Sequence, residues 1–313
     1  MRRMILRRLL QAVPLLLIVS SFTFVLVSLI PGSVATALLG DTGTPAEIVA
    51  IQRQLGLNRP VYVQYWHWLD GVLHGSLGSS FQNHQSVASI LNARIGVTLT
   101  LVIATVIVVA IVGVSLGVLA AVRPGVIGRS VDSLSWLGLA IPNFWLGLLL
   151  VAFFSIFLSV LPSEGFVAFS TSPLRWLESL VLPVIALAAG PLAIVVKQTR
   201  DAMVSVLESE FVRTLRASGL GERSIVLKHA LRNAAVPVVT VLGVLFAQLL
   251  SGTVIVETVF VLPGLGSLAA SSVSAHDLPV IEGVAVYFTL IVIAINLLTD
   301  TVYGWLNPKV RVT

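Results

Sequence analysis

The sequence of 313 residues contains no cysteine, and only 11% of its residues are charged. Without cysteine there is no disulfide, no thiolate metal site and no thiol nucleophile. A soluble domain carries about 25% charged residues, so this chain has too little polar surface to stay dissolved. Hydrophobic residues make up 57% of the chain instead. The composition therefore excludes soluble enzymes, coiled coils and disordered proteins, and it indicates a membrane protein.

Six stretches lack Asp, Glu, Lys and Arg for about the 17 to 25 residues that a membrane-spanning helix needs. These stretches are 9–30, 95–122, 133–162, 179–196, 233–256 and 283–299. The third is long enough to include a turn or a helical approach before Pro142. The predicted fold class is therefore all-α, a polytopic membrane protein with about six transmembrane helices.

The first stretch also imitates a signal peptide. Four arginines precede it, and Ala35-Thr36-Ala37 follows it in the manner of a cleavage site. Its apolar region is longer than the roughly 7 to 15 residues of a signal peptide. We therefore expect a retained first helix.

Basic residues indicate the orientation, because Lys and Arg accumulate in cytoplasmic loops. With the amino terminus inside, only Arg53, Arg59, Arg94 and Arg175 of the 19 basic residues lie outside. We expect a multi-pass protein of the plasma (inner) membrane with both termini in the cytoplasm. In a membrane protein the placement of the basic residues matters more than the net charge of +5. We therefore expect the lipid bilayer, and no nucleic acid, as a partner. The expected division is 1–30, cytoplasmic terminus and first helix; 31–94, extracytoplasmic segment; and 95–313, five-helix core with a loop at 197–232.

The outside segment has a helical pattern of its own. Leu55-Gly56-Leu57-Asn58-Arg59-Pro60 is typical of a helix end followed by a turn. Aromatic residues then recur at helical spacing from Tyr62 to Trp68, as in a helix at the membrane interface. Two interpretations remain open, a packed cap over the helix bundle and a docking surface for an outside partner.

The loop at 197–232 predicts a helical elbow. Leu207, Phe211 and Leu215 recur every four residues, which favours a short amphipathic helix. Gly219 and Gly221 follow where a left-handed cap would fit, and 222–235 predicts a second helix that returns to the membrane. Taken alone, the elbow could also lie on lipid headgroups, attracted by its basic residues.

Motifs in the elbow and elsewhere resemble one family. Glu210-Phe211-Val212-Arg213-Thr214-Leu215-Arg216-Ala217-Ser218-Gly219-Leu220, continued by His229-Ala230-Leu231-Arg232-Asn233, is similar to the EAA loop of peptide-importing ABC permeases. Further similar motifs are Leu55–Pro60, Gly75–Phe81, Ala140–Trp145, Glu257–Phe260 and Pro263–Gly266. Together they resemble the B-type (DppB/OppB-type) transmembrane subunit of dipeptide and oligopeptide importers, including the nickel and glutathione branches. Leu215 replaces the usual Ala and Ser218 the usual Lys, so the loop keeps its Gly219 hinge and loses one positive charge.

This resemblance implies a type I ABC importer permease whose EAA-type elbow is a coupling helix for ATPases. The coupling residues that it implies are Leu207, Glu210, Phe211, Arg213, Thr214, Leu215, Arg216, Ala217, Ser218 and Gly219. The implied partners are a second, C-type permease subunit in a heterodimer, two ATPase subunits or domains, and an extracytoplasmic solute-binding protein. ATP and Mg would be bound by the ATPase partners, so this chain would carry no cofactor.

The chain has no catalytic constellation of its own. Gly219 to Gly221 lacks the GxxxxGK[ST] spacing of a phosphate-binding loop, and the five histidines form no metal motif. Polar residues inside the spans predict a translocation path or contacts between helices. They are Asn143, Gln248, Ser251, Thr253 and Asn296. We expect a non-catalytic permease for peptides, with nickel or glutathione as alternative cargo. An ion-coupled secondary transporter is disfavoured because the six stretches lack charge.

Overall fold

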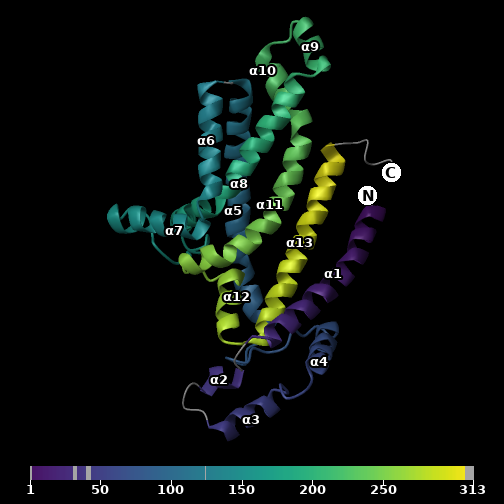
Figure 1. Ribbon diagram of the computed structural model, residues 1–313, viewed down its shortest axis with the longest axis vertical. Coiled ribbons are helices and arrows are strands. Elements are labelled where there is room, and N and C mark those ends of the chain that lie inside the picture. Colours follow the sequence, from purple (N-terminus) through teal and green to yellow (C-terminus); the bar gives the residue numbers. More distant parts are fainter. Residues whose placement is uncertain (1, 31–33, 40–43, 124, 307–313) are drawn as a thin grey trace. The chain divides into compact units, whose positions relative to one another are not determined.

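The computed structural model describes residues 2–30, 34–39, 44–123 and 125–306 (Figure 1). In these residues the regular elements are helices, with one isolated antiparallel bridge between Ser79 and Ser86. The chain divides into two compact units. The first contains Leu99–Leu262 and the residues from Ala294 onward, and the second contains Arg2–Thr98 and Pro263–Ile293. Helices α5 (Val87–Val122) and α13 (Leu278–Leu306) contribute residues to both.

The first unit is built around two long helices, α8 (Pro173–Leu207) and α11 (Leu231–Val259), which pack along each other. Their neighbours are α6 (Val126–Ala140), α7 (Asn143–Leu150), the π-helix η2 (Val151–Phe157), α9 (Glu210–Ala217), α10 (Glu222–Ser224) and the π-helix η3 (Ile225–Ala230). The core joins Val109 of α5 to Val195 of α8 and Leu245 of α11. Figure 1 shows α9 at the tip of this unit, beyond the ends of α8 and α11.

Close packing in this unit depends on small residues. A Cβ atom at Gly117 of α5 would lie 2.6 Å from Cβ of Thr199 and 2.7 Å from the carbonyl oxygen of Val196. Such distances leave no room for a side chain, so α5 and α8 approach backbone to backbone. This is the packing that small residues permit between membrane helices.

The second unit contains α1 (Arg2–Ser28), α2 (Val34–Leu39), α3 (Pro45–Gln54), α4 (Val61–Leu73), α12 (Leu265–Ser274) and the first parts of α5 and α13. The structure confirms both predicted features of the outside segment: α3 ends before Gly56, which has φ +69°, and the aromatic pattern forms α4. Tyr65 of α4 contacts α1, since its hydroxyl is 2.9 Å from Oγ of Ser20 and its ring lies edge to face with Phe24.

A buried carboxylate fastens the 75–86 loop to the start of α13 inside the second unit. Asp277 is 3% exposed and accepts hydrogen bonds from Oγ of Ser80 at 2.5 Å and from the backbone N–H of Phe81 at 3.0 Å. The side-chain amide of Gln82 donates to the carbonyl of Ala275 at 3.0 Å. These bonds account for the burial of a charged group that would otherwise be costly.

Five described helices are long and apolar enough to cross a membrane, and a bent pair would make a sixth. The prediction of about six spans therefore agrees, and the helical approach expected before Pro142 in 133–162 is helix α6. Helices α6 and α7 meet at Pro142 with a bend of 99°. Pro142 lacks the N–H that would continue the helix and keeps Ile141 extended, with ψ 121°.

The spans are also longer than the charge-free stretches, and they contain carboxylates. Helix α11 includes Glu257, and α13 includes Glu282 and Asp300. Glu257 and Glu282 are fully buried. The carboxylate oxygens of Glu282 have no hydrogen-bond partner among the described residues. The argument against an ion-coupled transporter from the absence of charge is therefore wrong, and the class of protein needs other evidence.

Candidate functional site

The elbow is built from two short helical segments after α8. Helix α8 ends at Leu207, and α9 begins at Glu210 after Ser209, whose carbonyl accepts the first hydrogen bonds of α9. The predicted amphipathic helix therefore exists, but Leu207 belongs to α8 and lies outside it. Glu210 in the first turn and Arg216 in the last turn match the helix dipole.

One face of α9 is anchored and the other is free. Val212 is fully buried, and α9 contacts η3. Below it, Met203 of α8 packs against Val226 and Ala230 of η3 in a core that also includes Leu207. Phe211 is 41% exposed although it is apolar, while Leu215 is half-buried. An exposed aromatic side chain on an anchored helix is suited to contact with a partner.

The turn after α9 has the geometry that glycine permits. Gly219 has φ +80°, as the cap prediction required. Its N–H donates to the carbonyl of Arg216 at 3.0 Å, and the N–H of Leu220 donates to Leu215 at 3.2 Å. Gly221, in contrast, has φ −67° and precedes α10, so the predicted left-handed position is Gly219 alone.

An ion pair that the sequence analysis missed closes the elbow. Nε and Nη2 of Arg216 donate to the two carboxylate oxygens of Glu222 at 3.1 and 2.7 Å. These hydrogen bonds raise the pKa of Arg216 above its ordinary value. The pair is exposed, and it spans the Gly219 turn and joins the two arms of the elbow. The sequence does carry a signal for this ion pair, because the acidic Glu222 lies six positions beyond Arg216, across a glycine turn.

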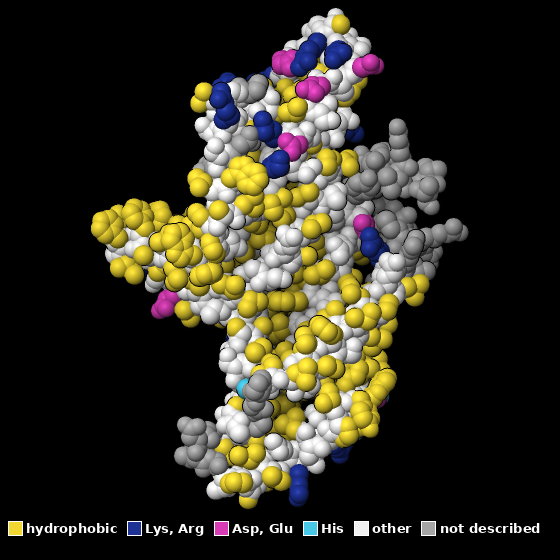
Figure 2. Space-filling model, viewed as in Figure 1, with side chains coloured by type: hydrophobic (Ala, Val, Ile, Leu, Met, Phe, Trp, Pro, Cys, Tyr) yellow, Lys and Arg dark blue, Asp and Glu magenta, His cyan; other side chains and the backbone are white. Residues whose placement is uncertain are grey.

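The other polar residues of α9 lie on its surface. The hydroxyl of Thr214 donates to the carbonyl of Glu210 at 3.2 Å, and that of Ser218 donates to Thr214 at 2.9 Å. Arg213 and Ala217 are exposed. Figure 2 shows charged side chains of both signs gathered at the end of the first unit where α9 and α10 lie, above a largely apolar surface.

The five polar residues predicted for a translocation path do not share one environment. Gln248 and Ser251 are exposed on one face of α11, three residues apart. Thr240 and Thr258 lie on the same face at helical spacing, together with the exposed apolar residues Val244 and Ile255. Asn143 begins α7, with its side-chain nitrogen 3.9 Å from the position of a Cβ on Gly252 of α11.

Thr253 and Asn296 lie elsewhere. Thr253 is fully buried, and its hydroxyl donates to the carbonyl of Leu250 at 2.7 Å. Its position therefore does not support a role in lining a path. Asn296 is exposed on α13.

The described residues form a helical protein with helices long and apolar enough to span a membrane and an elbow anchored by Val212. The chain belongs to the family of binding-protein-dependent transport system inner membrane components. Residues 113–312 match that family, and residues 1–102 match the family of its amino-terminal regions. The chain is therefore an integral membrane protein with a permease fold.

Named relatives cover nearly the whole chain. A peptide transport system permease protein of Brucella abortus is 40% identical over 312 residues, which is 99% of each chain. The glutathione transport system permease protein of Salmonella choleraesuis is 38% identical over 311 residues, covering 98% of each chain. A chain of the MetNI methionine ABC transporter, solved in inward-facing conformations, has a TM-score of 0.58 at 18% identity. That likeness covers 70% of this chain and 96% of the other, and it shows the fold.

Proposed function

We propose that the chain is the permease subunit of an ATP-driven importer that moves dipeptides or oligopeptides across the plasma membrane. The observation that carries this proposal is the anchored elbow, which presents Phe211 to a partner while Val212 holds the helix in place. The peptide transport name of the Brucella relative supports the cargo. Glutathione is the second candidate, because the Salmonella relative carries that name.

The proposed complex supplies what this chain lacks. Two ATPase subunits or domains bind ATP and Mg, and the elbow of this chain docks on an ATPase, so this subunit is non-catalytic and carries no cofactor. The coupling surface consists of the elbow residues from Glu210 to Gly219, with Leu207 at its root. At the rim of this surface Arg213 is exposed and can contact the ATPase, whereas Arg216 is paired with Glu222. A C-type permease completes a heterodimer, and a solute-binding protein delivers the cargo from outside.

The translocation path in this proposal follows the face of α11 that carries Gln248 and Ser251. Gln248 and Ser251 provide exposed polar groups on a membrane helix, where such groups line a water-filled path or contact another helix. Asn143 lies near the same helix, and Asn296 adds a polar group on α13. A path between two permease subunits would give these side chains water on one side.

Uptake by the reconstituted complex tests the cargo. In proteoliposomes with its partner permease, ATPases and binding protein, we expect accumulation of a labelled dipeptide or tripeptide that requires ATP. Labelled glutathione and Ni²⁺ serve as matched cargo controls. Accumulation of glutathione alone would establish the second candidate, and uptake driven by an ion gradient without ATP would contradict both.

The proposed orientation places both termini and the elbow in the cytoplasm and the 31–94 segment outside. Because the chain has no cysteine, single cysteines report without background. Ser79 and Ser218 are both exposed, so both positions are open to a reagent. In intact cells we expect an impermeant maleimide to label Ser79→Cys and to leave Ser218→Cys unlabelled until the membrane is permeabilised. The reverse pattern would invert the topology and the proposed division of the chain into 1–30, 31–94 and 95–313.

A further inference from the structure

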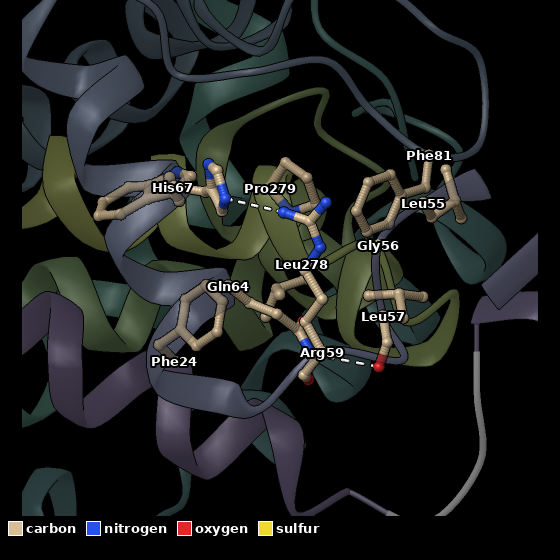
Figure 3. A pocket seen from close by; sticks show the side chains of 11 residues that line it. Phe24, Leu55, Gly56, Leu57, Arg59, Gln64, His67, Phe81, Leu278 and Pro279 are labelled. Atoms are coloured by element: carbon tan, nitrogen blue, oxygen red, sulfur yellow. Dashed lines mark hydrogen bonds between the residues drawn. The ribbon is translucent and has the colours of Figure 1, made fainter. Parts of the chain in front are cut away.

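The second unit contains a cavity of about 170 Å³ that the proposed coupling does not use (Figure 3). Its wall combines Phe24 of α1, the turn at Leu55–Leu57, three residues of α4 and the start of α13 at Leu278. All of these residues belong to one compact unit. In the proposed orientation the turn and α4 lie outside the membrane, so the cavity would be reached from that side.

One side of the cavity carries a positively charged side chain, that of Arg59, which has no carboxylate partner among the described residues. Nη1 of Arg59 lies 2.8 Å from Nε2 of His67, as the dashed line between them in Figure 3 marks. A guanidinium can only donate, so the His67 nitrogen is the acceptor. Among the described residues no acidic side chain pairs with Arg59. Most of its five donors therefore remain available for an anion, which Arg binds through paired hydrogen bonds.

A second donor in the wall also has no acceptor. The indole N–H of Trp68 is buried and has no hydrogen-bond partner among the described residues. A buried N–H without an acceptor is unfavourable, and most such groups are satisfied in proteins. The neighbouring amide of Gln64 is already used, because its nitrogen donates to the carbonyls of Leu57 at 3.2 Å and Arg59 at 2.7 Å. Because the indole N–H of Trp68 is enclosed in the wall, a molecule in the cavity does not reach it, and Arg59 is the donor that the cavity offers.

The rest of the wall is apolar and of limited size. Phe24 is 2% exposed, and Phe81, Leu55 and Leu278 complete the apolar lining. The volume is close to that of the roughly 150 Å³ apolar cavity that holds one benzene molecule. A single aromatic ring or branched side chain would therefore fill the space.

We propose that this cavity binds an organic carboxylate whose apolar group has the size of one amino-acid side chain. The carboxylate bonds to Arg59, while the apolar group lies against Phe24 and Leu278. Two sources carry this chemistry, a free acid and the carboxyl-terminal residue of a short peptide. The peptide source rests on the proposed function, and the free acid does not.

Titration of the assembled transporter in lipid nanodiscs tests the cavity. The probe is 3-phenylpropionate, and the matched neutral probe is 3-phenylpropionamide, with binding followed by calorimetry and ligand-observed NMR. We expect the acid to bind at least about tenfold more tightly than the amide, as a charge-assisted hydrogen bond would give. Arg59→Gln should remove this difference, and Arg59→Lys should keep part of it.

Arg53→Gln is the matched control, because Arg53 is an exposed arginine on α3 that does not line the cavity. This variant should leave the affinities for the acid and for the amide unchanged. Equal binding of acid and amide, or an undiminished preference in Arg59→Gln, would mean simple partitioning into an apolar gap and would overturn the proposal. Failure of the acid to bind at millimolar concentration would do the same.

A peptide ending in phenylalanine and its carboxyl-terminal amide then separate the two sources. Preference for the free carboxylate in the peptide pair assigns the cavity to peptide ends. Preference confined to 3-phenylpropionate assigns it to free acids. Uptake of labelled peptide is measured separately on the same complex, so the cavity and the proposed function can fail independently.

Discussion

Replacing Phe211 by Asp is expected to reduce ATP-driven uptake by the complex about 10- to 100-fold while the chain still enters the membrane. Phe211 is the large apolar side chain that α9 exposes, and burial of such a group contributes about 1.5 to 3 kcal/mol. An aspartate there would carry a charge into an apolar contact, which is unfavourable without a partner. Co-purification of the ATPase subunits and ATPase activity stimulated by the loaded binding protein measure the effect.

Two further variants of the elbow separate coupling from other roles. Phe211→Leu keeps an apolar side chain and should retain most of the uptake. Gly219→Val forces a β-branched residue to φ +80° and should disrupt the turn. If the elbow lies on lipid headgroups instead, Arg223→Gln should be more harmful than Phe211→Asp. Full recovery of ATPase subunits and full coupling in Phe211→Asp would contradict the proposed role.

The elbow illustrates how far hydrophobic spacing can predict structure. Leu207, Phe211 and Leu215 keep a period of four across a break, although Leu207 ends α8 in the core beside η3 and Phe211 is exposed on α9. Periodicity alone therefore does not reveal that the helix ends at Leu207. Ser209 followed by Glu210 was the local sign of a new helix start. Gly219 was predictable because the left-handed position after a helix favours a residue without a Cβ.

The bend at Pro142 was only half predictable. Proline indicates a break, but the direction of the next helix depends on contacts with distant parts of the chain. Gly147 of α7, for example, packs against Phe260, since a Cβ there would lie 3.2 Å from the Phe260 ring. No feature of 133–162 encodes that contact.

Charge and exposure were the least predictable properties. The charge-free stretches end before Glu257 and begin after Glu282, although both carboxylates are buried within helices. Charge marks the limits of a span only where no tertiary packing accommodates the side chain. Likewise, Ser251 and Thr253 are two residues apart on α11, yet one is exposed and the other buried. Sequence indicates that such residues are polar, and the packing partners decide which of them can face a path.

Replacing Gly117 by Ala is expected to lower the stability of the first unit by about 1 to 3 kcal/mol. The added Cβ would meet the carbonyl oxygen of Val196 at 2.7 Å and Cβ of Thr199 at 2.6 Å, both on the rigid helix α8. Alanine favours a helix more than glycine does, so the change in helix propensity alone would stabilise the protein. Any loss of stability therefore reports the collision of the new Cβ with α8. Thermal unfolding of the purified complex in nanodiscs measures it.

Gly96→Ala is the control for this collision. Gly96 lies on the same helix, α5, and an added Cβ there would meet nothing within 4 Å. The control should therefore unfold at the wild-type temperature or slightly above it, while Gly117→Ala should unfold several degrees lower and assemble in reduced yield. Equal unfolding temperatures for the two variants would show that α5 and α8 can separate by a few tenths of an ångström without loss. The close approach of α5 and α8 would then contribute little to holding the root of the elbow in place.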